Sequence, residues 1–371
     1  MSQLNRAAIQ KIKVNFYSIL PSPYQRDLFF ELSRCPEIDL TVYYLEPSCA
    51  DSPWPEKPLQ HYEHILPGFH LAWGLSRFHF NWHFPSTTQA DVVVLNGYMN
   101  LTTQLLLRLQ AKKIPCIFWG EKMVGSSEGI KGKLQKYLAD SLRYCRAIAA
   151  IGTKAQQDYQ LRFPNQPIFN IPYYCDLTAF SQNLPQRPRN PVTILFCGQM
   201  IGRKGVDILL QAFNHLIQSG YNARLLLVGR EAELPQLLET LPAQTRQKIE
   251  YAGFQSPENL PEFFHQADLF VLPSRYDGWG VVVNQAIGAG LPVICSDGVG
   301  AGYDLVKPGE NGNLFPNGNT EALAGVLIDY LQQPDTIKVA SAGSMQKATE
   351  LSPAIGAQRW VEVFQKLTGI V

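Results

Sequence analysis

Short apolar runs alternate with segments of helical periodicity along the whole chain. In the first half, strands are predicted at 13–20, 40–44, 91–95, 116–119 and 147–151, with helices at 24–34, 101–112 and 131–145. In the second half, strands are predicted at 192–197, 224–228, 249–251, 269–272 and 292–295, with helices at 205–218, 258–266, 281–289 and 319–332. This alternation predicts an α/β architecture built on parallel sheets.

The length of the chain predicts two domains. A chain of 371 residues exceeds what one hydrophobic core usually supports. The polar segment 181–191 contains three prolines, which predicts an interdomain linker there. After Pro353 an amphipathic segment places Trp360, Val363 and Phe364 on one face, and it is expected to form a closing helix.

Composition excludes several classes of protein. With 46% hydrophobic and 17% charged residues the chain is expected to be ordered and globular. A net charge of +1 without a basic stripe argues against a nucleic-acid partner. The seven cysteines are odd in number and scattered, which predicts neither a disulfide framework nor a structural zinc site. No apolar stretch reaches the roughly 18 residues of a membrane span, so a cytoplasmic location is expected.

Two glycine-rich turns carry the candidate chemistry. The first follows the strand 192–197 and is basic, and its candidate residues are Gly198, Gln199, Gly202, Arg203 and Lys204. The second follows the strand 269–272 and presents Asp277 between glycines, in the run Asp277, Gly278, Trp279 and Gly280. Basic side chains and free backbone amides suit a diphosphate, whereas a carboxylate accepts hydrogen bonds from sugar hydroxyls. Together the two turns indicate a nucleotide-sugar site.

These motifs resemble those of the retaining family-4 glycosyltransferases of the GT-B fold. That family pairs Gly-Arg with a later Lys-Gly, and here the pairs are Gly198-Gln199 and Lys204-Gly205, with Gln at the Arg position. Its two acids stand eight positions apart, and here those positions hold Asp277 and Gln285. The resemblance implies two Rossmann-like parallel-sheet domains facing a cleft, with a C-terminal helix that crosses back to the first domain.

The resemblance also assigns roles within this fold. Residues 181–352 would bind the donor, and residues 1–180, completed by the helix 353–371, would bind the acceptor. Lys204 and Arg203 would bind the donor diphosphate, Asp277 the donor sugar and Gln285 the ribose. The remaining donor-binding candidates are Gly198, Gln199, Gly202, Gly229, Arg230, Phe254, Gly278, Trp279, Gly280, Val281 and Val282. No cofactor or metal is expected, and the donor is expected to be a UDP- or GDP-sugar.

The first half matches the family less closely. Where the family often carries a His that meets the donor sugar, this chain has Glu121, a further catalytic candidate, with Asn96 and Tyr98 expected on the same rim. A surface ion pair between Glu121 and Lys122 or Lys133 is the alternative. The leading interpretation is sugar transfer to a hydroxyl acceptor by front-face attack, with retention. The alternative is a degenerate protein that binds a nucleotide sugar or a partner without efficient transfer.

The segment 131–146 leaves two interpretations open. It carries Lys131, Lys133, Lys136, Arg143 and Arg146 around an apolar stripe. Such a basic amphipathic helix suits a lipid-linked acceptor and a peripheral contact with the inner face of a membrane. A helix that packs its stripe on a core and exposes its basic side is the favoured alternative, because most amphipathic helices do this.

Overall fold

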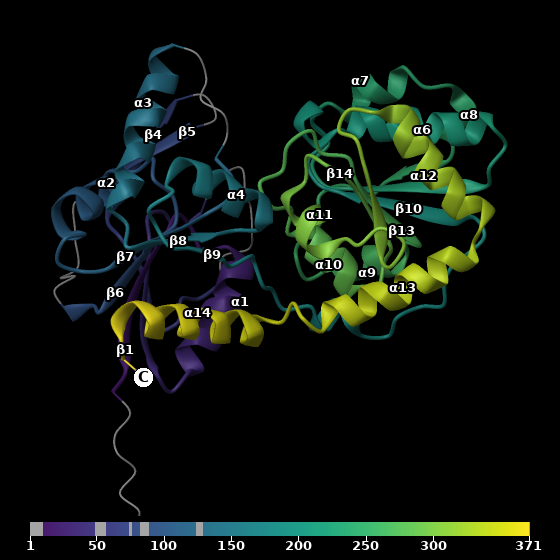
Figure 1. Ribbon diagram of the computed structural model, residues 1–371. Coiled ribbons are helices and arrows are strands. Elements are labelled where there is room, and N and C mark those ends of the chain that lie inside the picture. The colour runs from purple at the N-terminus through teal and green to yellow at the C-terminus, as the bar shows by residue number, and fades with distance from the viewer. Residues whose placement is uncertain (1–9, 49–56, 74–75, 82–88, 124–128, 371) are drawn as a thin grey trace, which may run out of the picture. The chain divides into compact units, whose positions relative to one another are not determined.

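The chain forms two compact units, which are described separately. The computed structural model describes residues 10–48, 57–73, 76–81, 89–123 and 129–370 (Figure 1). Unit 1 contains residues 1–174 and 353–371, and unit 2 contains residues 175–352. No helix among the described residues is long and apolar enough to span a bilayer.

Unit 1 is built on a seven-stranded sheet in the order β3-β2-β1-β6-β7-β8-β9, in which every neighbouring pair is parallel. Its strands are β1 (Ile12–Ser18), β2 (Ile38–Tyr44), β3 (Glu63–Ile65), β6 (Val92–Leu95), β7 (Cys116–Gly120), β8 (Ala147–Ala150) and β9 (Ile168–Asn170). Strands β6, β7 and β8 are buried along their whole length, as expected for central strands of a parallel sheet covered on both faces.

Unit 1 contains five helices among the described residues, and two of them continue into a short non-α turn. They are α1 (Pro23–Arg34), α2 (Leu101–Leu105) with a π-helical turn at Leu106–Gln110, α3 (Ile130–Ala139) with a 3-10 turn at Asp140–Tyr144, α4 (Thr153–Arg162) and α14 (Pro353–Thr368). A separate antiparallel hairpin is formed by β4 (Gly68–Trp73) and β5 (Ser76–Asn81).

The last helix, α14, belongs to the core of unit 1. The Trp360 ring lies 5.4 Å from that of Phe16 on β1 and 5.5 Å from that of Trp119 on β7, centroid to centroid. All three side chains are fully buried. A helix from the far end of the chain therefore completes the first unit, which confirms the expected return of the C-terminal helix.

Unit 2 is built on a six-stranded parallel sheet in the order β12-β11-β10-β13-β14-β15. Its strands are β10 (Val192–Cys197), β11 (Ala223–Val228), β12 (Ile249–Tyr251), β13 (Leu269–Leu272), β14 (Val293–Ser296) and β15 (Gly312–Phe315). Its helices are α5 (Thr178–Ser181), α6 (Val206–Gln218), α7 (Leu234–Glu239), α8 (Ala243–Arg246), α9 (Leu260–His265), α10 (Val282–Gly288), α11 (Gly300–Leu305), α12 (Thr320–Gln332) and α13 (Asp335–Ala348).

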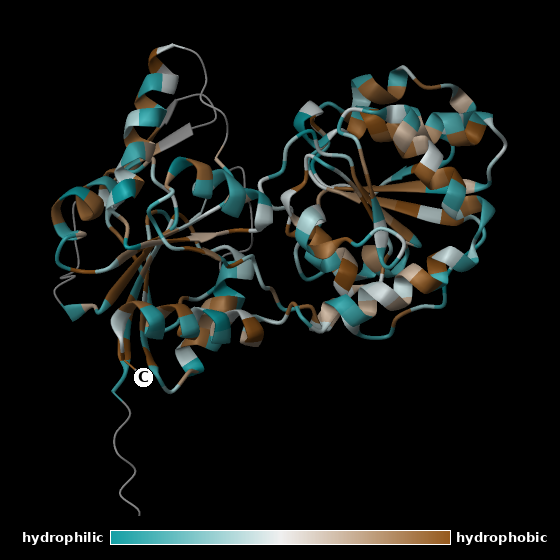
Figure 2. Cartoon of the chain, in the orientation of Figure 1, coloured by the Kyte–Doolittle hydropathy of each residue, from teal (hydrophilic) through white to brown (hydrophobic). Residues whose placement is uncertain are grey.

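Helices cover both faces of the unit 2 sheet. Helices α6, α7, α8 and α12 lie on one face, and α9, α10, α11 and α13 lie on the other (Figure 1). Apolar residues concentrate in the strands, while the outer sides of the helices are polar (Figure 2). This two-sided cover explains why β10, β11, β13 and β14 are mostly apolar runs that the sequence identifies readily.

The proline-rich segment 181–191, which the sequence predicts as an interdomain linker, lies within unit 2. The chain passes between the units at 174–175 and again at 352–353. Arg187 is buried and donates to the carbonyl oxygen of Ala267 at 2.8 Å. The carboxylate of Asp268, also buried, accepts from the backbone N–H groups of Arg189 and Thr193. These contacts fix the segment onto the sheet.

The order of strands in unit 2 creates a topological switch point between β10 and β13. Connections from these two neighbouring strands leave in opposite directions, because β11 lies on the outer side of β10 and β14 on the outer side of β13. In doubly wound sheets, ligands bind outside the carboxyl ends of the strands at such a point. The two glycine-rich turns identified in the sequence follow β10 and β13, so both lie at this point.

Candidate functional site

The two glycine-rich turns meet through an ion pair between Lys204 and Asp277. The Lys204 Nζ lies 2.5 Å from Asp277 Oδ2, and the two side chains are only 17% and 12% exposed. The Ser274 hydroxyl lies 3.4 Å from the same carboxylate oxygen. Partial burial shields this pair from solvent, so each charge holds the other in place more firmly than at an open surface. The structure thus brings together the two residues that the sequence identified separately.

Glycines allow the backbones of these turns to approach closely. Gly205 has φ +69°, and a Cβ there would lie 2.0 Å from the carbonyl oxygen of Pro273 on the second turn. Gly229 has φ +136°, and a Cβ there would lie 1.9 Å from the carbonyl oxygen of Gly198. Any other residue would push the turns apart, because both its φ angle and its Cβ are unfavourable. Gly205 therefore keeps Lys204 within reach of Asp277.

Arg275 clamps the first turn to the second, and sequence reasoning missed it. Its guanidinium donates to the carbonyl oxygen of Gly202 at 2.6 Å and to both carboxylate oxygens of Asp207 at 2.7 and 2.6 Å. Its backbone N–H donates to the carbonyl oxygen of Arg203 at 2.8 Å. The hydrogen bonds from Arg275 lower the pKa of Asp207 below its usual value. In the sequence, Asp207 adjoins the first turn and Arg275 adjoins the second, and this placement of opposite charges was the signal available.

Replacing Asp207 by Asn is expected to lower stability at neutral pH by less than about 1 kcal/mol, because solvent screens a pair this exposed. A lowered folded-state pKa stabilises the fold above the unfolded-state pKa of about 3.9, and this stabilisation is lost as pH falls through the folded-state pKa. The difference in melting temperature between wild type and Asp207→Asn should therefore shrink toward pH 3. The control is Glu350→Gln, which removes an exposed partner of Lys347. A difference that persists in acid would contradict this origin.

The loop at 298–302 supports Asp277 from behind. The backbone N–H of Asp277 donates to the carbonyl oxygen of Gly298 at 3.1 Å, and that of Gly300 donates to the carbonyl oxygen of Asp277 at 3.0 Å. A Cβ on Gly300 would lie 2.1 Å from the carbonyl oxygen of Gly278. The glycines here allow tight packing against the second turn and the start of α11.

Three consecutive backbone amides follow Asp277 and lie beside its ion pair with Lys204. Within the part of the chain that the structure describes, the N–H groups of Gly280, Val281 and Val282 have no hydrogen-bond partner. Gln285 is half-buried on α10 shortly after them. Trp279 is fully buried, and its indole N–H donates to Asn284 Oδ1 at 2.9 Å, so its side chain anchors the turn to α10. The open amides can donate to an anion.

Three of the expected donor-binding residues, Gly229, Arg230 and Phe254, lie together after the neighbouring strands β11 and β12. The N–H of Gly229 donates to the carbonyl oxygen of Gly253 at 2.8 Å. The guanidinium carbon of Arg230 lies 6.0 Å from the centre of the Phe254 ring, and Phe254 is 48% exposed. Gly198 contacts this group through the backbone of Gly229. An exposed aromatic face beside an arginine can stack a planar base.

The remaining residues of the first turn face solvent. Gln199 and Arg203 are exposed, and Arg203 donates to the carbonyl oxygen of Tyr276 at 3.0 Å. Among the described residues Arg203 has no carboxylate partner, so its charge is available. Cys197 precedes the turn, and burial raises the pKa of its thiol to about 12. This thiol is protonated at neutral pH and is a poor nucleophile.

Glu121, Asn96 and Tyr98 belong to unit 1 and follow β7 and β6 at the carboxyl edge of its sheet. The carbonyl oxygen of Glu121 accepts from the Tyr159 hydroxyl at 2.7 Å. Asn96 Nδ2 donates to the carbonyl oxygen of Trp119 at 2.9 Å. These three candidates share one edge, whereas Lys204 and Asp277 lie in unit 2.

Comparison with known proteins links the second unit to one sequence family. Residues 180–347 match the family described as "Glycosyl transferases group 1". AmsK, an amylovoran biosynthesis glycosyltransferase of Erwinia amylovora, is 26% identical over 51% of this chain and 48% of its own length. O-antigen chain mannosyltransferase B of Escherichia coli is 26% identical over 59% of this chain and 60% of its own length. The chain thus spans less than two thirds of either relative.

Solved structures resemble the whole chain. A sucrose-phosphate synthase from Thermosynechococcus elongatus has a TM-score of 0.74 at 16% identity, covering 97% of this chain and 100% of that one. The lipopolysaccharide outer core galactosyltransferase WaaB has a TM-score of 0.71 at 14% identity, covering 96% and 100%. The fold is therefore GT-B, as the sequence motifs predict.

Proposed function

We propose that the protein is a retaining family-4 glycosyltransferase that moves a hexosyl group from a nucleotide-diphosphate sugar to a hydroxyl of a glycan, glycolipid or small molecule. The observation that carries this proposal is the Lys204–Asp277 pair, held between two glycine turns at the switch point of unit 2. The similarity of residues 180–347 to group 1 glycosyltransferases supports it.

Donor binding would break the ion pair between Lys204 and Asp277 and replace it by contacts from each residue to the donor. The diphosphate would take the Lys204 ammonium, the Arg203 guanidinium and the open amides of residues 280–282. Asp277 would then accept hydrogen bonds from the sugar hydroxyls, and Gln285 would contact the ribose. Fixed positive groups at the diphosphate stabilise the negative charge that develops there as the sugar leaves.

Retention follows from front-face attack. The bond between the anomeric carbon and the diphosphate oxygen breaks, and the acceptor oxygen bonds to the same face of that carbon. The acceptor proton passes to the leaving diphosphate oxygen, so the step needs no protein nucleophile. The high pKa of Cys197 agrees with this, since the thiol nearest the first turn stays protonated. The protein then contributes positioning and electrostatic stabilisation.

The two units would divide the work, with donor binding in unit 2 and acceptor selection in unit 1. Replacing Glu121 by Ala is expected to lower transfer by about tenfold or more, because the loss of one positioning contact misaligns the acceptor. Nucleotide affinity, measured by calorimetry, should stay unchanged. The control is Asp39→Ala, an exposed carboxylate on β2. A folded Glu121→Ala protein that binds nucleotide much more weakly would contradict this division.

The surface of α3 supports a lipid-linked acceptor at the inner face of a membrane. Ile130 and Tyr137 are 81% and 60% exposed, and Lys133 and Lys136 are exposed on the same helix. A helix that buried its whole apolar stripe would hide Ile130 and Tyr137. Apolar and basic side chains exposed together suit an anionic lipid surface. Sedimentation with anionic and neutral vesicles tests this part of the proposal.

A panel of UDP-, GDP- and ADP-sugars tests the proposed reaction. Each donor is incubated with the protein, and hydrolysis or transfer to added acceptors is followed by release of the nucleoside diphosphate. Turnover with one donor, and inversion or retention read by NMR of the product anomer, would establish the reaction and its stereochemistry. Tight nucleotide binding without turnover across the panel would instead favour the binding-only alternative.

A further inference from the structure

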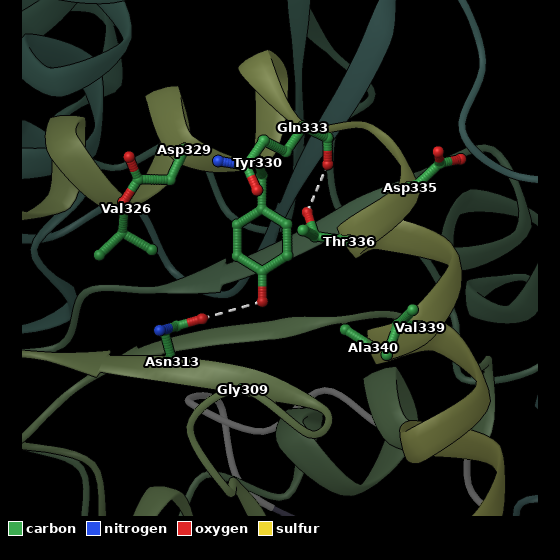
Figure 3. A pocket seen from close by; sticks show the side chains of 10 residues that line it. All are labelled: Gly309, Asn313, Val326, Asp329, Tyr330, Gln333, Asp335, Thr336, Val339 and Ala340. Carbon is green, nitrogen blue, oxygen red and sulfur yellow. Dashed lines mark hydrogen bonds between the residues drawn. The ribbon is translucent and has the colours of Figure 1, made fainter.

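Unit 2 contains a pocket that is separate from the two glycine turns. It has a volume of about 330 Å³ and lies among the end of α12, the start of α13 and the edge strand β15 (Figure 3). Gly309, just before β15, forms part of its wall. Because β15 begins at Gly312, this is the amino end of the strand, whereas the glycine turns follow the carboxyl ends of β10 and β13. A pocket of this volume is large enough for one small organic ring.

The apolar lining of the pocket lies on both sides of the Tyr330 ring, with Val326 on one side and Val339 and Ala340 on the other (Figure 3). Val339 is 63% exposed, which leaves an uncovered apolar side chain at the mouth. Burial raises the pKa of Tyr330 to about 12, so its hydroxyl stays protonated and donates to Asn313 Oδ1 at 2.9 Å. This hydrogen bond fixes the ring as a rigid surface.

Polar groups with unused hydrogen-bonding capacity lie among these apolar side chains (Figure 3). The carboxylate of Asp329, the side-chain amide of Gln333 and the Asn313 NH₂ group line the pocket. None of the three has a side-chain partner for these atoms among the residues that the structure describes. The Thr336 hydroxyl donates to the Gln333 carbonyl oxygen at 2.6 Å, so its oxygen can still accept. The lining therefore offers hydrogen-bond acceptors and donors within one small space.

This mixed lining restricts the chemistry of a ligand. A purely apolar ligand would cover the polar groups without pairing them, which costs about 1–3 kcal/mol for each group. An anion would meet Asp329 and Asp335, and the nearby Lys338 already pairs with Asp335 at 2.8 Å. A sugar ring suits this mixed lining, since its C–H face can pack on Tyr330 and Val339 while its hydroxyls pair with Asp329, Asn313 and Gln333.

We propose that this pocket binds one neutral sugar residue of a glycan, as a secondary site away from the donor. The proposal rests on the proposed function in one respect, namely that a glycan is the acceptor or product that this protein meets. A site of this kind would retain a growing chain near the enzyme between transfers. Because the pocket lies at the amino end of β15, its occupation leaves the donor turns accessible.

The test is direct binding without any donor. Methyl glycosides of glucose, galactose and mannose are titrated into the full chain, and the methyl NMR signals of Val326, Val339 and Ala340 are followed. At least one glycoside is expected to give saturable shifts at these methyl groups. Val339→Trp fills the mouth of the pocket and should weaken binding by about tenfold or more. The matched control, Ala342→Trp, places the same ring on the exposed side of α13 outside the pocket and should bind normally.

Each outcome bears on the proposal. Asp329→Asn keeps the size of the side chain, removes its charge and should weaken glycoside binding without unfolding the protein, because Asp329 is exposed. Absence of saturable shifts, equal saturation in Val339→Trp, or binding of only a charged amine such as choline would overturn it. Nucleotide affinity should be equal in all variants. Loss of transfer in the donor panel with intact glycoside binding would reject the proposed reaction and leave the pocket assignment standing.

Discussion

Lys204→Ala is expected to lower the rate of sugar transfer by about a hundredfold or more, because it removes a fixed positive charge from the leaving diphosphate. The same change should weaken nucleoside diphosphate binding, since the ammonium would contact the phosphates in the ground state as well. It also leaves the carboxylate of Asp277, only 12% exposed, without its cation. Steady-state kinetics and calorimetry on the same preparation give both quantities.

Two controls separate this effect from misfolding and from loss of surface charge. Lys307→Ala removes an exposed lysine of unit 2 that pairs with Glu310 at 3.4 Å, and it should leave transfer and affinity unchanged. Circular dichroism and thermal melting should show that Lys204→Ala is folded. Near-normal turnover in a folded Lys204→Ala protein would remove Lys204 from the proposed mechanism.

Unlike Lys204→Ala, which should lower both quantities, Asp277→Asn is expected to lower the rate of transfer without weakening nucleoside diphosphate binding. Transfer should fall by about a hundredfold, because a neutral amide accepts weaker hydrogen bonds from the sugar hydroxyls than a carboxylate does. Nucleoside diphosphate affinity should be equal to wild type or higher, because the substitution releases Lys204 from an ion pair that the diphosphate must otherwise displace. Calorimetry with the nucleoside diphosphate alone, beside a transfer assay, measures both.

The control for Asp277→Asn is Glu239→Gln on α7, an exposed carboxylate outside the site. The double variant, with Lys204→Ala and Asp277→Asn together, should lose more activity than Lys204→Ala alone, because after the exchange the two residues contact different groups of the donor. If Asp277→Asn weakened diphosphate binding as much as Lys204→Ala does, the two residues would share one role and the exchange of the ion pair would be wrong.

The strands differ in how well the sequence predicts them. Strands β10 and β13 are almost entirely apolar, because both faces of a central parallel strand are covered, and they end at a glycine and a proline turn respectively. The short edge strands β3, β9 and β15 were missed, and so was the hairpin of β4 and β5. These strands are partly exposed and carry polar or aromatic residues, so their composition resembles that of loops.

Helices α4, α11 and α13 were missed because their local sequences are poor helix signals, and α13, like α4, carries only a weak apolar stripe. The sequence of α4 is polar with a weak apolar stripe, and α11 begins with Gly300 and Gly302, which disfavour helix in isolation. Glycine is nevertheless needed at position 300, because a Cβ there would collide with the backbone of Gly278 on the second turn. Tertiary packing therefore overrides local propensity at these places.

The sequence by itself determined the α/β class, strands β10 to β14 of the second half and the two turns that hold Lys204 and Asp277. It could do so because glycine at a strand end and an apolar run are local signals with local causes. Only the tertiary structure decided that Lys204 pairs with Asp277, that Arg275 clamps the turns through Asp207 and that residues 298–302 support Asp277. It also formed the pocket around Tyr330 from α12, α13 and β15. Contacts between residues far apart in sequence depend on the packing of whole elements, and no local pattern specifies them.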